Sequence, residues 1–154
     1  MNIPLFISII FLLLINGYFV ALPLSKKRPV LIKNVGIPLY TFTLFSIVSS
    51  LSNIFFLAVG ILIAIFFYMK HAWFVFGISK EEILATLKKA ANLTRSDMKE
   101  TGGNYLIDNG SMKIQIICLN KKTNFIIFKE LCFSKKANLS KEVVRKFIQN
   151  YIMK

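Results

Sequence analysis

The chain has 154 residues, 55% of them hydrophobic and 18% charged, and a net charge of +13. Soluble globular chains carry about 25% charged residues, so this composition excludes an ordinary soluble domain and indicates one modest domain beside a membrane region. Residues 1–70 hold five charges, all basic, whereas all seven acids lie beyond residue 80. We therefore predict a transmembrane region over residues 1–70 and a small basic domain over residues 71–154.

The first predicted element is a membrane-spanning helix over residues 3–24. This run is almost continuously apolar and no charged side chain precedes Lys26, and about 20 apolar residues cross a hydrocarbon core. A cleaved signal peptide would have a basic segment before the apolar run and small residues at the cut. The bulky Tyr18 and Phe19 near the only plausible cut favour an uncleaved span.

The second uncharged run, residues 34–69, permits two interpretations. Either the polar residues around Ser52 form a turn between two short spans, 36–51 and 54–69, or one span covers 44–68. Basic residues concentrate in cytoplasmic loops. Three spans place both basic clusters, at 26–33 and 70–89, in the cytoplasm, although spans of about 16 residues are short. We favour a multi-pass protein of the cell membrane with its C-terminal domain in the cytoplasm.

Small residues four apart allow close packing of helices in lipid. Two such pairs, Gly17/Ala21 and Gly60/Ala64, are candidate packing sites, although the spacing is also common by chance. No ionisable residue falls at membrane depth, which argues against a transporter or pump. The aromatic residues after the last span are typical of an interfacial belt; they are Tyr68, Trp73, Phe74 and Phe76.

The C-terminal domain is predicted to be α+β, in the order α-β-β-β-α, with an antiparallel three-stranded meander. Ser79 and Glu82 form a capping box that starts the first helix, and Ser140 is expected to cap the last one. The last helix carries an apolar stripe at helical spacing, which predicts a core-facing side. The stripe consists of Val143, Val144, Phe147, Ile148, Tyr151 and Ile152.

Two turns set the expected strand pairing. Asp108-Asn109-Gly110-Ser111 is a strong hairpin signal that places Tyr105 opposite Ile114 and Ile107 opposite Met112. A second turn at residues 121–122 pairs Ile116 with Ile127, Cys118 with Phe125 and Lys113 with Glu130. One face of the meander is then apolar and the other only half apolar. That second face is expected to receive a partner, the bilayer surface, another copy of the chain or the loop 92–103.

The residues needed for catalysis are few. His71 is the only histidine and lies at the membrane exit, so no Ser-His, Cys-His or multi-His site is expected. Residues 101–104, Thr-Gly-Gly-Asn, lack the Gly-Lys-Ser/Thr ending of a phosphate loop and are interpreted as a linker. Cys118 and Cys132 are expected far apart and free, which suits a reducing compartment. We predict no enzyme activity, no cofactor and no metal site.

The basic residues of the domain are its most distinctive surface feature. Basic groups near an anionic leaflet contribute about 1 kcal/mol each to membrane binding, which makes these residues candidates for contact with anionic lipid head groups. They are Lys121, Lys122, Lys135, Lys136, Lys141, Arg145 and Lys146. Nucleic acid is a second interpretation, without an aromatic ladder, helix-turn-helix or zinc signature to support it. A further interpretation is that these lysines are solvated surface residues without a partner and reflect a lysine-rich proteome.

The leading hypothesis from sequence is therefore an integral membrane protein, of bacterial type, that has no catalytic role. Its small domain would act by contact with a protein partner, with the membrane surface or with a second copy of the chain, in regulation or in self-protection against a membrane-active toxin. The alternative is a membrane-tethered nucleic-acid-binding protein.

Overall fold

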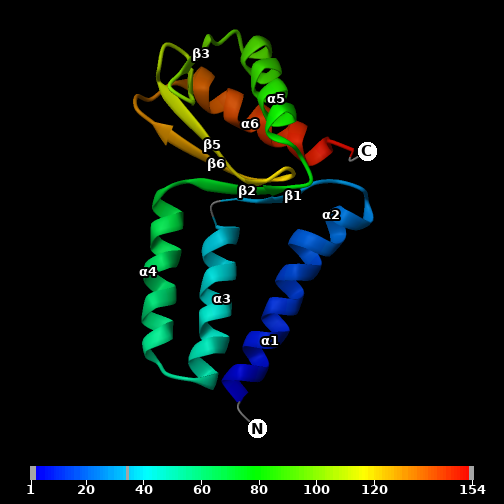
Figure 1. The fold of residues 1–154 in the computed structure, drawn as a ribbon, viewed down its shortest axis with the longest axis vertical. Helices are drawn as coiled ribbons and strands as arrows, with labels where there is room; N and C mark the ends of the chain where they lie inside the picture. Colours follow the sequence, from blue (N-terminus) through cyan, green and yellow to red (C-terminus); the bar gives the residue numbers. More distant parts are fainter. Residues whose placement is uncertain (1–2, 34, 153–154) are drawn as a thin grey trace.

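The computed structural model describes residues 3–33 and 35–152. A six-stranded antiparallel sheet has two helices packed on one face, and three apolar helices extend away from the end of the sheet formed by β1 and β2 (Figure 1). This arrangement places the apolar helices in one layer and the charged part of the chain in another.

The N-terminal helix is continuous from Ile3 to Ser25 and contains three segments. These are α1 (Ile3–Asn16), the π-helical turn η1 (Gly17–Ala21) and α2 (Leu22–Ser25). The backbone amides of Lys26 and Lys27 donate to the carbonyls of Pro23 and Leu24 and end the helix. Cations after the last turn also interact favourably with the negative end of the helix dipole.

Residues 36–69 form a helical hairpin of α3 (Gly36–Leu51) and α4 (Phe55–Met69). The break lies in the polar cluster, where the side chain of Asn53 accepts a hydrogen bond from the amide of Phe55 at 3.0 Å. A half-buried polar contact also joins α1 to α3: the hydroxyl of Tyr40 donates to Asn16 Oδ1 at 3.1 Å. Ser8 and Ser46 make a second contact between these helices, with their Oγ atoms 3.1 Å apart.

The expectation of two or three transmembrane helices is wrong for the part of the chain that the structure describes. Only the segment Leu5–Ser25, 21 residues long, is long and apolar enough to cross a membrane. Helices α3 and α4 have 16 and 15 residues, short of the roughly 20 that a span needs. The polar break that divides the apolar run therefore leaves two helices that are each too short.

The three-stranded meander is also wrong, because the sheet has six strands in the order β1-β2-β6-β5-β4-β3. Its outer strands are β1 (Val30–Ile32) and β3 (Met98–Thr101). The inner strands are β2 (Ala72–Phe76), β4 (Asn104–Ile107), β5 (Met112–Asn120) and β6 (Thr123–Glu130). Strand β1 comes from the segment 1–70 and pairs with β2, so the first 70 residues contribute to the sheet.

Strand β2 accounts for part of the expected aromatic belt. Trp73 is only 2% exposed and packs on Phe128, with ring centroids 4.4 Å apart. The segment after α4 alternates buried and less buried residues as a strand does, and Trp73 and Val75 face the core. The belt interpretation is therefore wrong for Trp73, which belongs to the protein core rather than to an interface with lipid.

The predicted Asp108–Ser111 hairpin is confirmed, with Tyr105 opposite Ile114 and Ile107 opposite Met112. The amide of Ser111 donates to the carbonyl of Asp108, and the two central residues, Asn109 and Gly110, have φ of 53° and 84°, as a type I′ turn requires. The linker at residues 101–104 is a second tight hairpin of this kind: Gly102 and Gly103 both have positive φ, and β3 pairs with β4 across them. Part of the loop 92–103 is therefore an edge strand.

The second hairpin has its turn at residues 121–122, but its register was predicted one residue out. A bulge between Cys118 and Asn120 adds one residue to β5, so Ile116 pairs with Ile126 rather than Ile127. A shift of one residue exchanges the two faces of a strand. Ile126 and Phe128 are consequently buried, and Phe125 and Ile127 lie on the other face.

Two helices cover the core face of the sheet. Helix α5 (Lys80–Leu93) begins with the predicted Ser79–Glu82 capping box, which is confirmed. Helix α6 (Lys135–Asn150) begins six residues earlier than predicted, because Ser134 rather than Ser140 is its N-cap. Ser140 is fully buried inside the helix, and its hydroxyl lies 2.5 Å from that of Thr94 at the end of α5.

Candidate functional site

The predicted basic surface residues do not form one patch. Lys121 and Lys122 occupy the tip of the β5–β6 hairpin, where the carbonyl of Lys122 accepts from the amide of Gly77. Lys135 and Lys136 are exposed at the start of α6, one full helix length away from the end of α6 that lies against β1. At 1.5 Å per residue, a helix of this length separates its ends by about 24 Å.

The remaining three predicted residues lie along α6. Lys141 pairs with Glu130 at 3.7 Å, and its ammonium lies 5.2 Å from the ring centroid of Phe128. Arg145 pairs with Glu142 at 2.7 Å. Lys146 is exposed. The predicted set is therefore divided between hairpin tip, helix start and helix body.

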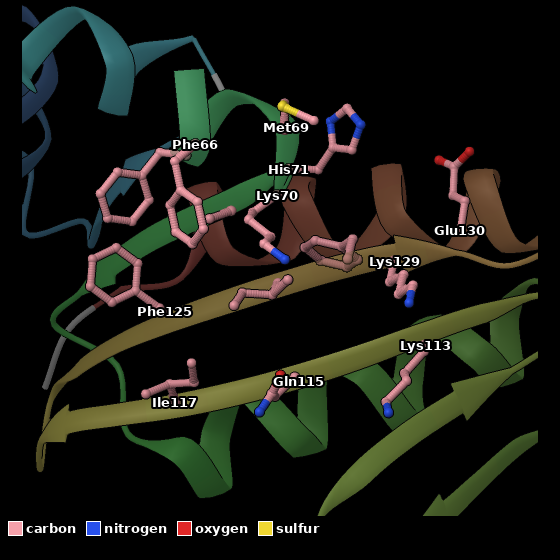
Figure 2. A pocket seen from close by; sticks show the side chains of 14 residues that line it. Phe66, Met69, Lys70, His71, Lys113, Gln115, Ile117, Phe125, Lys129 and Glu130 are labelled. Atoms are coloured by element: carbon pink, nitrogen blue, oxygen red, sulfur yellow. The ribbon is translucent and has the colours of Figure 1, made fainter. Parts of the chain in front are cut away.

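A groove of about 700 Å³ lies where the end of α4 meets the outer face of β5 and β6 (Figure 2). Its apolar wall includes Phe66 of α4 and Phe125 of β6, and Phe125 stacks on Phe67 with centroids 6.1 Å apart. Basic side chains line the other part of the groove: Lys70, Lys113 and Lys129. The groove thus combines an aromatic wall with a cationic rim beside the apolar helices.

The cationic rim of this groove contains two lysines that lie opposite each other on neighbouring strands. Lys113 and Lys129 are direct cross-strand partners, and Figure 2 shows both side chains at the same end of the groove. Like charges directly opposite each other destabilise a sheet. The only acid in the lining, Glu130, is shared with Lys141. The rim is therefore better suited to an anion than to a cation.

A second pocket, of about 500 Å³, lies between the end of the N-terminal helix, β1 and the C-terminal half of α6. We call it the cationic pocket. Four basic side chains line it, and none of its lining residues is acidic; the four are Lys26, Arg28, Lys33 and Arg145. Tyr18, Phe19 and Leu22 of the N-terminal helix form its apolar part.

The charges in the cationic pocket repel one another. The pKa of Lys33 is held below its ordinary value, first by burial and then by the positive charge of Arg145, and Glu142 offsets this only partly. The Nε of Arg145 is buried without an acceptor among the residues that the structure describes. The pocket thus carries more positive charge than the surrounding residues neutralise.

The sequence contained both halves of this pocket but no sign that they meet. Lys26, Arg28 and Lys33 are interpreted from sequence as markers of membrane orientation, and Arg145 as one of the surface residues that contact anionic lipid head groups. The two segments are more than 110 residues apart, and the pairing of β1 with β2 brings them together. No local spacing pattern predicts a contact of that kind.

The residues predicted to pack helices have different surroundings. A Cβ on Gly60 would lie 2.3 Å from Cβ of Phe45, so this glycine permits the close approach of α3 and α4. A Cβ on Gly17 would meet nothing within 4 Å, and Ala21 is exposed. Ala64 is half-buried. Close packing therefore depends on Gly60 in α4, while Gly17 lies in the π-helical turn.

Potential catalytic groups are scattered. Within residues 3–33 and 35–152, no group of three or more His, Cys, Asp or Glu side chains is placed to hold a metal. Thr94, Ser96 and Ser140 form a hydroxyl cluster, but all three are at most 8% exposed. Cys118 and Cys132 are exposed free thiols. The hydroxyl cluster joins α5 to α6 and has no access to a substrate.

The carboxylate of Glu82 has a perturbed pKa, and its surroundings explain the shift. Glu82 accepts hydrogen bonds from the hydroxyl of Tyr151 and the amide of Ser79, which together hold its pKa below the ordinary value. The same contact raises the pKa of Tyr151. Glu82 thus ties the start of α5 to the end of α6, which is a structural role.

Comparisons of this chain with protein-family models, with curated proteins and with solved structures found no match. Function is therefore inferred from the geometry of the groove, the cationic pocket and the apolar helices.

Proposed function

We propose that this chain is a membrane-anchored protein without catalytic activity, whose sheet domain acts by contact at the membrane surface. The observation that carries the proposal is the exposure of the apolar helices. Only 6% of the most apolar window of the N-terminal helix is buried, whereas a core helix of this composition would be mostly covered. Leu13 of α1 and Leu62 of α4 are 66% and 68% exposed.

In this proposal the N-terminal helix crosses the bilayer, and the α3–α4 hairpin is embedded beside it. The α3–α4 pair leaves the sheet at Lys33 and returns to it at Lys70. Contacts between α1 and α3 hold the hairpin against the anchor (Figure 1). A hairpin that enters lipid from the side of the sheet needs neither helix to be long enough for a full crossing.

The proposed orientation places the sheet domain in the cytoplasm. All five charges of residues 1–70 are basic and lie at the sheet end of the apolar helices: Lys26, Lys27, Arg28, Lys33 and Lys70. An excess of basic residues at the ends of membrane segments is typical of the cytoplasmic side. Two exposed free thiols in the domain fit the same compartment.

The two native thiols provide the test of this orientation. Spheroplasts that express the full-length chain are treated with a membrane-impermeant maleimide before and after lysis, and the membrane fraction is collected. We expect the chain in the membrane pellet after an alkaline wash, with Cys118 and Cys132 labelled only after lysis. A C118S/C132S variant is the blank for the label. Labelling in intact spheroplasts contradicts the orientation, and recovery in the supernatant contradicts membrane anchoring.

A further inference from the structure

We propose that the cationic pocket is a binding site for one anionic glycerophospholipid, whose phosphate lies among Lys26, Arg28, Lys33 and Arg145. This inference rests on the proposed membrane anchoring and adds to it a defined site and ligand class. It also differs from the surface contacts expected from sequence, because it involves three lysine or arginine residues that follow the anchor helix and only one of the α6 residues.

Charge complementarity is the first argument. The lining has four cationic groups and no acid. Glu142, which lies outside the lining, pairs with Arg145 at 2.7 Å, and no acid of the lining faces the other three. Bringing like charges together is unfavourable unless an anion lies between them. A phosphate accepts charge-assisted hydrogen bonds from both lysine and arginine, so it would remove the repulsion that the pocket contains.

The donors available on Arg145 are the second argument. A guanidinium has five N–H donors, and the described residues provide an acceptor for Nη2, from Glu142, and none for the buried Nε. The Nε itself is shielded from solvent, so a phosphate in the pocket would contact the exposed part of the guanidinium, whose side chain is 28% exposed. Its planar fork suits the oxygen atoms of a phosphate better than a lysine does.

The apolar part of the pocket distinguishes a lipid from free phosphate. Phe19 and Leu22 line it, and they belong to the turns of the N-terminal helix that lie just before the charged residues. Tyr18 and Leu22 are 68% and 49% exposed, so an apolar surface runs from the pocket along the anchor helix. The acyl chains of a bound lipid would follow that surface into the bilayer, while the phosphate stays at the level of β1.

The test measures lipid binding to the full-length chain purified in a non-ionic detergent. Dioleoyl-phosphatidylglycerol and dioleoyl-phosphatidylcholine are titrated separately, and bound lipids are counted by native mass spectrometry. We expect one phosphatidylglycerol per chain bound in preference to phosphatidylcholine. The K33Q/R145Q variant should lose roughly 10- to 30-fold in affinity for phosphatidylglycerol, because each basic group near an anionic lipid contributes about three- to fivefold.

Two matched variants keep the test specific. K135Q/K136Q removes the same amount of charge from the exposed start of α6 and should change the affinity by less than about twofold, because these residues lie outside the pocket. K33R keeps the charge and should keep the binding. Equal losses in K33Q/R145Q and K135Q/K136Q, or equal binding of the two lipids, overturn the assignment. Thermal unfolding of each variant shows whether a loss comes from the site or from the fold.

A separate measurement distinguishes this proposal from the one it rests on. The wild-type chain is reconstituted into vesicles of phosphatidylcholine alone and washed at alkaline pH. Retention in these vesicles without a preference for phosphatidylglycerol overturns only the lipid site. Loss from the vesicles overturns the membrane anchoring and the lipid site with it.

Discussion

Gly60 is the residue on which the close packing of α3 and α4 depends. A Cβ at this position would lie 2.3 Å from Cβ of Phe45, whereas one at Gly17 would meet nothing within 4 Å. Gly60→Ala should therefore destabilise the folded chain by about 1–3 kcal/mol through overpacking. Gly17→Ala is the matched control and should be neutral or stabilising by up to about 1 kcal/mol, because alanine is the better helix former. Unfolding in mixed micelles measures both, and equal effects contradict the contact.

Glu82 and Tyr151 give the domain a pH dependence whose sign follows from their pKa shifts. The hydroxyl of Tyr151, and then the amide of Ser79, hold the pKa of Glu82 below its ordinary value. The stabilisation by the Glu82 carboxylate is thus present above the unfolded pKa of about 4.3 and is lost as pH falls through the lower folded pKa. The hydrogen bond to Glu82 raises the pKa of Tyr151, so the stabilisation by the protonated hydroxyl is lost only in alkaline solution, above about pH 10.

Tyr151→Phe tests this account. Removing the hydroxyl should lower the free energy of unfolding at pH 7 by about 1 kcal/mol, at the low end for a hydrogen bond to a charged group because Glu82 is partly exposed. The difference between variant and wild type should shrink below pH 4, where the carboxylate becomes protonated. Denaturant unfolding at pH 7 and pH 3 measures both values. A difference that is the same at both pH values would exclude the ionised carboxylate as the cause.

At the level of elements, the start of α6 depends on which of two serines, Ser134 or Ser140, caps the helix. Ser134 Oγ accepts from the amide of Ala137, whereas Ser140 is fully buried against Thr94. Ser134→Ala should cost about 1 kcal/mol through loss of the N-cap. Ser140→Asp should prevent folding, because it buries a carboxylate without a partner. If Ser140 were the cap, aspartate there would be tolerated; circular dichroism and thermal unfolding of the two variants decide between these cases.

The features predicted correctly from sequence are a helix start and a hairpin turn, each set by residues close together in the chain. The Ser79–Glu82 capping box and the Asp108–Ser111 turn fix backbone hydrogen bonds within four residues, and both are confirmed. The β5 bulge and the cap at Ser134 were missed although both are local: the bulge lies between Cys118 and Asn120 next to the turn, and Ser134 accepts from an amide three residues on. Strand β1 is three residues long and entirely buried, so it gives no alternating pattern. The cationic pocket could not be predicted either, because its two halves meet only through the pairing of β1 with β2.

At the scale of the whole molecule, the chain separates its apolar and charged surfaces along one axis. The apolar helices lie on one side of β1 and β2, and the helices α5 and α6 lie on the other (Figure 1). The composition of residues 1–70 predicted this separation. It did not predict the number of helices long enough to cross a membrane, which depends on where the polar residues around Ser52 divide the second apolar run.

The most direct test measures whether lipid or water surrounds α1 and α4. Single cysteines replace Leu13, Leu62 and Leu139 in a C118S/C132S background, each is spin-labelled, and the chain is reconstituted in vesicles. Collisions with oxygen, which concentrates in lipid, are compared with collisions with a water-soluble nickel chelate. If the apolar helices lie in lipid, labels at Leu13 and Leu62 meet oxygen, and the label at Leu139, which is 56% exposed on α6, meets the chelate. Access of the chelate to Leu13 and Leu62 would contradict this placement in lipid.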